Sequence, residues 1–284
     1  MHIDALLRAD RTRSFEFFPT KSDAEAATLE ETLRELSPLE PSFVSVTYRG
    51  GAESRQRTFD LVSRIQGETG IVAMAHLICV GHRRDELREI LESYLEHGVT
   101  NVMALGGDVP DDPALAAADL QYASELVELV KSVGDFSVGV AAHPLGHPRS
   151  PSLESDRHYL AQKLAQADFA VTQFFFEAHD WISLVNDLAD RGITKPVVPG
   201  VIPVTTLSGI PRMATMGAAV PASLVERLER AHEVGGPAAV RQAGIDAATE
   251  MCRTLLDEGA PGLHFYTMNR STATREIHSA LYGV

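Results

Sequence analysis

The sequence is short of several residue types, and each shortage narrows the classes of protein that it can encode. Only two of its 284 residues are cysteine, Cys79 and Cys252, which is typical of a reducing compartment. No apolar run approaches the roughly 18 residues that span a membrane. Residues 1–13 lack the apolar core of a secretion signal. We therefore expect a cytoplasmic protein without membrane contacts.

Basic residues are also scarce. The chain has 25 Lys and Arg against 39 Asp and Glu, which gives a formal net charge of −14. This charge repels nucleic-acid phosphates and anionic lipids, so we expect no nucleic-acid partner. An anionic substrate or cofactor must then be held by local groups, such as single arginines and helix N-termini.

Short apolar runs alternate with amphipathic stretches of about 12 to 18 residues, a pattern typical of parallel βαβ units. The predicted strands are residues 14–18, 43–47, 72–76, 101–105, 137–141, 169–173, 196–200 and 262–266. The predicted helices are residues 24–36, 54–66, 84–97, 116–133, 152–167, 179–189, 207–216, 222–234, 237–258 and 272–281.

Eight strand–helix units are the number that closes an α/β (β/α)8 TIM barrel, and the length suits one such domain. We predict a single catalytic barrel over residues 1–284, with extra helices before the eighth strand. An open doubly wound sheet is disfavoured, because no Gly-rich turn follows the first strand.

A single carboxylate stands inside an aromatic strand, at Glu16 in the segment Ser14-Phe15-Glu16-Phe17-Phe18-Pro19. Because side chains alternate along a strand, Glu16 points away from Phe15 and Phe17, into surroundings expected to be apolar. Such surroundings raise the pKa of a carboxyl group and make it a proton donor near neutral pH. An ion pair with an arginine of a neighbouring strand is the alternative.

Polar residues end nearly every predicted strand, which is where a barrel places its active site. Gly106 and Gly107 let a flat ligand approach the backbone, and the Gln173 amide beside aromatic residues suits the edge of a planar heterocycle. The strand-end residues are Glu16, Thr47, His76, Gly106, Gly107, Asp108, His143, Gln173, Pro203, Thr205, Tyr266, Asn269 and Arg270.

Three other chemistries fit this set less well. A Schiff-base aldolase needs a lysine at a strand end, whereas Lys195 begins its strand and the other three lysines fall in loops or helices. A metal hydrolase needs more carboxylates near its histidines, so we expect no metal site. A glycosidase usually has several tryptophans for sugar stacking, and this chain has only Trp181.

Seven segments together resemble the methylenetetrahydrofolate reductase family, in the family's order from residue 14 to residue 270. The resemblance is to the bacterial type, a catalytic barrel without the further C-terminal domain of eukaryotic enzymes. The matching segments are SFEFFP at 14–19, FVSVTY at 43–48, HL at 76–77, GD at 107–108, TQFFF at 172–176, PGVIPV at 199–204 and HFYTMNR at 264–270.

The resemblance implies reduction of 5,10-methylenetetrahydrofolate to 5-methyltetrahydrofolate, normally by FAD reduced by NADH or NADPH. Glu16 matches the general acid that protonates N10, so that the ring opens to a 5-iminium cation. Asp108 matches a carboxylate that stabilises this cation, Gln173 the residue that holds the folate heterocycle, and Arg270 an orienting residue. The implied cofactor-binding positions are Thr47, His76, Gly107, Tyr122, His143, His147, Asp156 and Lys163.

Three departures from the family pattern fall on flavin contacts. Gly106 replaces an arginine, His143 a tyrosine and Tyr159 an asparagine. Each lost charged hydrogen bond costs about 1.5–3 kcal/mol. We therefore favour direct hydride transfer from NADH or NADPH, with the FAD-dependent ping-pong reductase as the alternative.

Two functions of other classes stay open, a non-catalytic folate-binding barrel and a folate-linked methyltransferase. The sequence also leaves open whether the helices between Ala222 and Glu258 cover the barrel or make contacts in a homo-oligomer.

Overall fold

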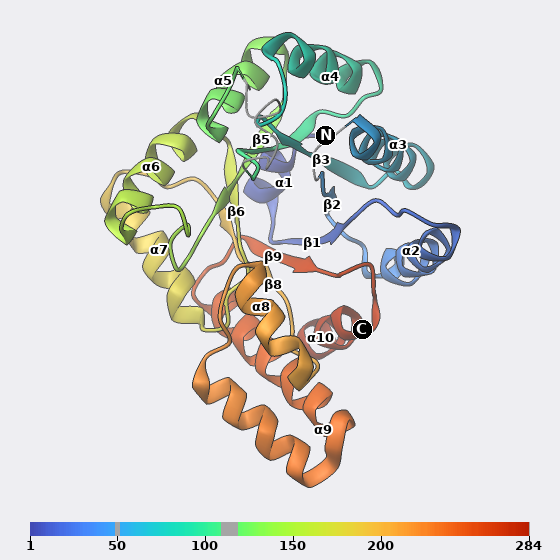
Figure 1. Ribbon diagram of the computed structural model, residues 1–284, viewed down its shortest axis with the longest axis vertical. Helices are drawn as coiled ribbons and strands as arrows, with labels where there is room; N and C mark the ends of the chain where they lie inside the picture. Colours follow the sequence, from blue (N-terminus) through green and yellow to red (C-terminus); the bar gives the residue numbers. More distant parts are fainter. Residues whose placement is uncertain (49–51, 109–118, 284) are drawn as a thin grey trace.

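The computed structural model describes residues 1–48, 52–108 and 119–283, and within them the predicted α/β barrel is confirmed. Parallel strands form a ring with helices around it (Figure 1). The order of strands in the sheet is β7-β6-β5-β4-β3-β2-β1-β9-β8. The strands are β1 (Thr12–Phe17), β2 (Phe43–Val46), β3 (Val72–Ile78), β4 (Asn101–Leu105), β5 (Ser137–Ala142), β6 (Phe169–Thr172), β7 (Val197–Val198), β8 (Gly200–Val201) and β9 (Gly262–Tyr266).

The predicted seventh strand is divided in two, and this division closes the barrel. Its first part, β7, pairs with β6, and its second part, β8, pairs with β9. Pro199 separates them and has no N–H to donate to a ladder. Its carbonyl accepts a hydrogen bond from His264 N at 3.0 Å. One run of residues therefore joins the two edges of the sheet.

The helices follow the predicted order, with one helix that the sequence did not suggest, α1. The predicted helix over 116–133 begins only at Ala123, because Tyr122 N donates to the Glu125 carboxylate at 2.8 Å and marks the helix start; residues 116–118 lie outside the described residues. The helices are α1 (Ile3–Ala9), α2 (Asp23–Leu36), α3 (Ala52–Thr69), α4 (Arg84–Glu96), α5 (Ala123–Val133), α6 (Leu153–Gln166), α7 (Ala178–Asp190), α8 (Ile210–Met216), α9 (Ala222–Asp257) and α10 (Thr272–Tyr282), with short 3-10 turns η1 (Ser37–Leu39) and η2 (Leu207–Gly209).

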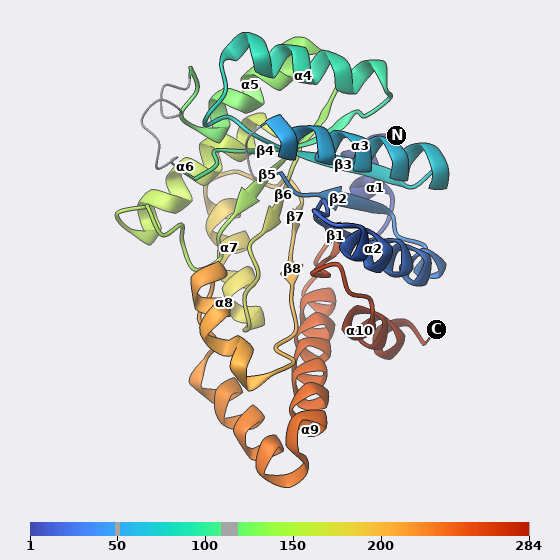
Figure 2. The same cartoon turned by 45° about the vertical axis from the view of Figure 1, so that its right-hand side comes forward.

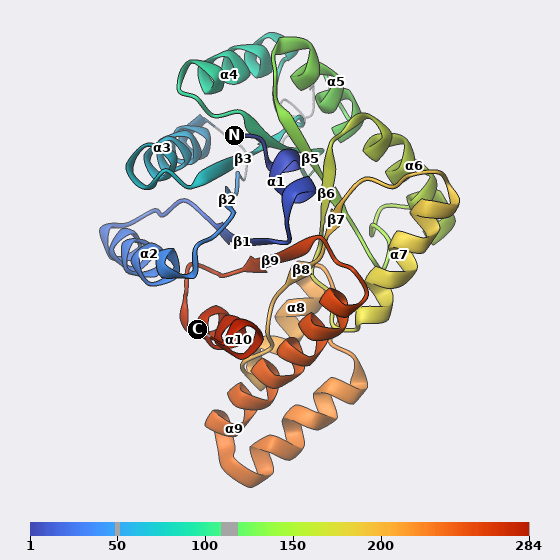
Figure 3. The ribbon, with the colours of Figure 1, turned by 180° about the vertical axis from the view of Figure 1, so that it is seen from behind.

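Helix α1 closes the amino-terminal end of the barrel (Figure 3). Ile3 N donates to Asn101 Oδ1 at 2.9 Å, and Asp4 N donates to Ser137 Oγ at 3.1 Å, at the starts of β4 and β5. Its apolar side chains join an interior cluster made of Ile3, Leu7, Phe43, Met74, Met103, Phe169, Val171 and Val198. The carboxyl ends of the strands are thus left to form the site.

The extra helices predicted before the last strand, residues 222–234 and 237–258, are the two arms of α9, which follows α8. Helix α9 bends at Gly235 and Gly236, where Gly236 adopts a φ of +61°, so it consists of two arms that project beyond the barrel (Figure 2). Helix α9 packs against α10 and α7. No helix in the described part of the chain is long and apolar enough to cross a membrane.

Candidate active site

Glu16 lies near the carboxyl end of β1, and three polar groups from three other strands surround its Oε2 atom. Ser45 Oγ donates to it at 3.3 Å, His76 Nε2 lies at 3.4 Å and His264 Nε2 at 3.5 Å. The prediction that Glu16 has apolar surroundings is therefore wrong. The site side of the strand faces hydroxyl and imidazole groups instead.

These neighbours change the acidity of Glu16. Burial raises its pKa, but the hydrogen bond from His264, the charges of His76 and His264, and the Ser45 hydroxyl outweigh burial and hold the pKa below its usual value. The predicted rise is therefore wrong for this structure. An alternating pattern reveals which way a side chain points, but it does not reveal what faces it.

The strand register explains the cluster. In the ladder Glu16 pairs with Ser45 of β2 and with Tyr266 of β9, and Ser14 pairs with His264. Tyr266 is held by its hydroxyl, which donates to Thr172 O at 2.7 Å. Burial and the nearby Glu16 charge raise the pKa of Tyr266 far above its usual value, so it stays neutral.

His76 presents an unused polar atom to the site. The side chain is buried, and its Nε2 finds no hydrogen-bond partner within the described ranges. Burial lowers the pKa of His76, and the charge of His264 lowers it further, against the opposing effect of Glu16. Buried nitrogens of this kind are costly unless a ligand meets them, so His76 is suited to contact a bound molecule.

The turn after β9 fixes the end of β1. Thr267 Oγ1 donates to the Glu16 carbonyl at 2.6 Å, and Asn269 bonds both backbone groups of Phe18. Met268 and Asn269 both adopt a φ of +53°, a left-handed conformation that is strained for methionine. This turn also carries Arg270, whose side chain is exposed.

Gln173 follows β6, and α8 covers it. Its Nε2 donates to Met216 O at 3.0 Å, and its Oε1 accepts from Phe174 N at 3.0 Å. An apolar cluster lies alongside, made of Phe174, Phe176, Ile202, Met213, Met216, Ala218, Tyr266 and Met268. This combination of one amide and an apolar wall suits a planar heterocycle.

Asp108 is exposed after β4, and among the described residues no hydrogen bond or ion pair joins it to Glu16. The negative charge of Asp108 acts on His147. Burial and the charge of Arg149 lower the pKa of His147, and they outweigh Asp156 and Asp108, which raise it.

Arg149 joins the loops after β4 and β5, because its NH2 group donates to Gly107 O at 3.2 Å. Gly107 adopts a φ of +88°, which requires glycine at this point.

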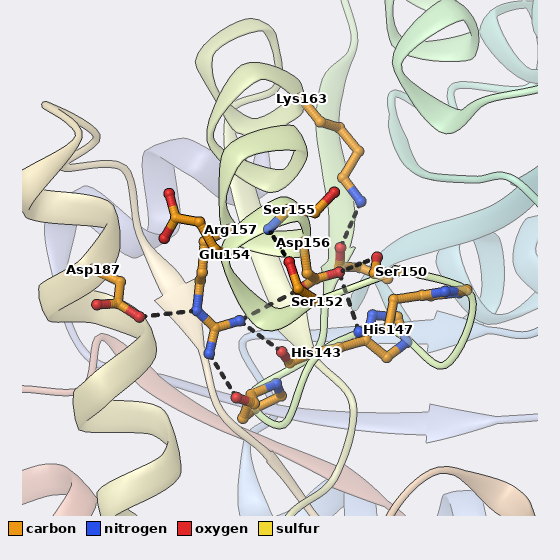
Figure 4. A network of polar contacts seen from close by, with 12 residues as sticks. His143, His147, Ser150, Ser152, Glu154, Ser155, Asp156, Arg157, Lys163 and Asp187 are labelled. Carbon is orange, nitrogen blue, oxygen red and sulfur yellow. Dashed lines mark hydrogen bonds and ion pairs between the residues drawn. The ribbon is translucent and has the colours of Figure 1, made fainter.

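Arg157 anchors the loop between β5 and α6, although the sequence did not single it out (Figure 4). It is 1% exposed. Its guanidinium donates to His143 O at 2.9 Å and to Pro144 O at 2.6 Å, and pairs with Asp156 at 3.3 Å and Asp187 at 3.2 Å. The loop is therefore held by a buried cation.

Two of the predicted cofactor positions near this loop are engaged within the protein. Asp156 Oδ1 accepts from His147 N at 3.1 Å and from Ser150 Oγ at 3.2 Å. Lys163 Nζ donates to Ala141 O at 2.8 Å, and burial lowers its pKa to about 8.

His143 packs edge-on against His147, with ring centroids 4.6 Å apart. Burial and the charges of His147 and Lys163 lower the pKa of His143 to about 4.

The remaining predicted positions are dispersed. Thr47 follows β2 and its buried Oγ1 has no partner within the described residues. Tyr122 is 67% exposed, and Tyr159, one of the departures from the family pattern, is 65% exposed. Within residues 1–48, 52–108 and 119–283, no group of three or more His, Cys, Asp or Glu side chains could hold a metal ion.

Three comparisons relate the chain to known proteins. The sequence model of the family described as "Methylenetetrahydrofolate reductase" matches residues 2–282. The 5,10-methylenetetrahydrofolate reductase of Pectobacterium carotovorum subsp. carotovorum is 36% identical over 266 residues, covering 93% of this chain and 88% of that protein. The enzyme of the same name from Escherichia coli (strain K12) is 36% identical over 267 residues, with the same coverage.

A solved structure shares the fold at low identity. It is an uncharacterized protein from Clostridium thermocellum, described as binding two copies of 5-methyl-5,6,7,8-tetrahydrofolic acid. It superposes with a TM-score of 0.68 at 13% sequence identity, over 99% of this chain and 97% of that one.

Proposed function

The chain belongs to the methylenetetrahydrofolate reductase family, and we propose that it reduces 5,10-methylenetetrahydrofolate to 5-methyltetrahydrofolate with NADH or NADPH as the hydride source. The observation that carries this proposal is the Glu16 cluster at the end of β1, because the reaction needs an acid beside a folate pocket. We propose that the apolar wall beside Gln173 receives the folate heterocycle.

Glu16 is proposed as the general acid. It gives a proton to N10, the bond between N10 and the methylene carbon breaks, and a 5-iminium cation forms. A hydride from the nicotinamide then adds to the methylene carbon and leaves NAD(P)⁺. Folate that seats on Glu16 excludes water from it, which raises the pKa of the carboxyl group from its low value and prepares it to give up its proton.

The other predicted residues take supporting roles. Gln173 holds the heterocycle, either by exchanging its bond to Met216 O for the ligand or by keeping it and offering Oε1. Asp108 acts through its charge on the cation, at longer range than a direct contact. Arg270, exposed beside the turn after β9, orients the anionic part of folate.

We further propose that hydride passes directly from the nicotinamide to folate. A flavin would supply a relay for that hydride when bound, and the side chains at the family's flavin positions suit it poorly. Lys163 and Asp156 bond protein groups, Tyr159 is exposed, and Gly106 offers no cation. The FAD-dependent ping-pong reaction is the alternative.

The proposed function is tested with purified protein, methylenetetrahydrofolate, and NADH or NADPH. We expect folate-dependent oxidation of one nicotinamide and no flavin absorption spectrum. Glu16→Gln should abolish turnover while the Kd for 5-methyltetrahydrofolate is kept. Glu276→Gln is a control, because Glu276 pairs with Arg241 on the surface at 2.8 Å.

Three outcomes would separate the alternatives. A stoichiometric flavin in the purified protein sinks direct transfer. Folate binding without nicotinamide oxidation favours a binding barrel. Methyl transfer without nicotinamide consumption favours a methyltransferase.

A further inference from the structure

A fully buried histidine, His264, lies beneath Glu16, and its hydrogen bonds bear on which ring nitrogen carries the proton. His264 Nδ1 lies 2.8 Å from Ser14 Oγ, and Ser14 donates its hydroxyl proton to Leu263 O at 3.2 Å. When Ser14 gives its one proton to Leu263 O, the hydrogen between Nδ1 and Ser14 comes from the histidine. This arrangement assigns Nδ1–H to His264, and Nε2 is the nitrogen that faces the site.

The Nε2 atom of His264 faces the Oε2 atom of Glu16, and without a proton between them both atoms present lone pairs to each other. It lies 3.5 Å from Glu16 Oε2, and Ser45 Oγ, at 3.4 Å from the same nitrogen, donates its proton to Oε2. A neutral Nε2 and an ionised Oε2 would repel each other, and Ser45 has one proton to share between them. A proton held between His264 and Glu16 removes this conflict.

We infer that His264 is a positioning residue that stores the proton which Glu16 delivers to folate, an inference that rests on the proposed reduction. The bond between Nε2 and hydrogen breaks as an O–H bond forms on Glu16, and this O–H bond then breaks as N10 takes the proton. Glu16 is left ionised. His264 is left neutral, with Nδ1–H still bonded to Ser14. It takes a proton from water after product leaves, so each turnover consumes one proton and one hydride.

Two further titratable groups face Glu16, and neither takes this role. His76 on β3 reaches Oε2 at 3.4 Å, but burial lowers its pKa, and its Nε2 has no hydrogen-bond partner among the described residues. Tyr266 on β9 commits its hydroxyl proton to Thr172 O, and burial raises its pKa. His264, oriented by Ser14, is the partner whose proton can reach Glu16.

The kinetic test uses His264→Gln, whose amide can occupy the Nε2 position but cannot store a proton. We expect kcat/KM at pH 8 to fall about 10- to 100-fold, with the Kd for 5-methyltetrahydrofolate within about threefold of wild type. The basic limb of the pH profile should move to lower pH, because a lone carboxyl group loses its proton at lower pH than the pair does.

The opposite shift would overturn the inference. His264 lowers the pKa of Glu16, so if Glu16 works alone, the substitution leaves the basic limb in place or moves it to higher pH. His278→Gln is the matched control: His278 is 1% exposed on α10 and packs on Tyr282. It should leave the limb unchanged.

A second variant and a spectrum keep the test decisive. Ser14→Ala removes the acceptor of Nδ1–H and should move the limb in the same direction by a smaller amount, even if His264→Gln fails to fold. In ¹⁵N spectra of labelled histidines, we expect His264 with Nδ1 protonated in every state, and with Nε2 losing its proton when 5-methyltetrahydrofolate binds.

A neutral Nε2–H tautomer in the spectrum would refute the inference. Because the spectrum needs no turnover, it decides the position of the proton even if the wild-type protein fails to reduce methylenetetrahydrofolate. Failure of the proposed function and failure of the inference are thus seen in different measurements.

Discussion

The Asn269 side chain holds both backbone groups of Phe18: its Oδ1 accepts from Phe18 N at 3.0 Å and its Nδ2 donates to Phe18 O at 2.8 Å. Phe18 follows the end of β1, and the Asn269 amide supplies the two backbone hydrogen bonds that a neighbouring strand would otherwise make. It fixes the residues that follow Glu16, and it also stabilises its own left-handed backbone at φ +53°.

Two substitutions of Asn269 separate these contributions. Asn269→Gly loses both hydrogen bonds but tolerates the backbone conformation, so we expect the free energy of unfolding to fall by about 1–3 kcal/mol. Asn269→Ala loses the bonds and adds about 1–2 kcal/mol of strain. Urea unfolding of both variants measures the difference. Equal stability of the two would show that the turn relaxes without strain.

Arg157 gives a prediction about the β5–α6 loop. Arg157→Met leaves Asp156 buried without its cation, so we expect a loss of about 3–5 kcal/mol in the free energy of unfolding. Arg157→Lys keeps the charge but not the forked donor, and should lose less. Chemical denaturation measures the free energy of unfolding of both variants. Wild-type values for Arg157→Met would contradict the anchoring role.

The depressed pKa of His143 predicts a loss of stability in acid. Its folded-state pKa is about 4, against 6.5 for the unfolded chain. Between these values the unfolded state binds the extra proton, so the free energy of unfolding falls as pH drops from 6.5 to 4, by at most about 1.4 kcal/mol per pH unit. His143→Tyr should flatten that part of the stability curve. An unchanged slope would mean that His143 titrates normally.

Flavin affinity should respond to the three departures from the family pattern. Restoring them with Gly106→Arg, His143→Tyr and Tyr159→Asn should tighten FAD binding by at least about tenfold, since the charged hydrogen bond of the restored arginine alone contributes about 1.5–3 kcal/mol. There is room for the first change, because a Cβ on Gly106 meets its nearest atom, Ala123 N, at 4.0 Å. Quenching of flavin fluorescence measures the Kd. If the triple variant bound FAD no more tightly than the wild type, these three positions would not be the cause of weak flavin binding.

The sequence predicted the barrel and the inward direction of Glu16, because both follow from periodicity. It did not predict what Glu16 meets. Ser45 and His264 lie far away in the sequence, and only the register of three strands brings them to one carboxylate. The same limit applies to Arg157, whose four partners come from the β5–α6 segment and α7.

Two features of the fold, helix α1 and the division of the seventh strand, could not be predicted from the sequence pattern. Helix α1 has seven residues, too few to show a repeating apolar pattern. The run over 196–200 was predicted as one strand, and its division depends on Pro199 and on having a different partner strand on each side. The predicted helix over 116–133 begins at Ala123 within the described residues, because the Glu125 carboxylate accepts from the backbone N–H of Tyr122 at its start.

The divided seventh strand makes the barrel wall weakest where it closes. Strands β7 and β8 have two residues each and supply few ladder hydrogen bonds, so we expect local opening to begin at this seam. The backbone amides of the seam should exchange hydrogen faster than those of the other strands. The Tyr266 hydroxyl spans the seam to Thr172, and the same residue pairs with Glu16 in the ladder. We therefore expect local opening of the seam to loosen Tyr266 beside Glu16, so that motion at the seam affects the position of the proposed acid.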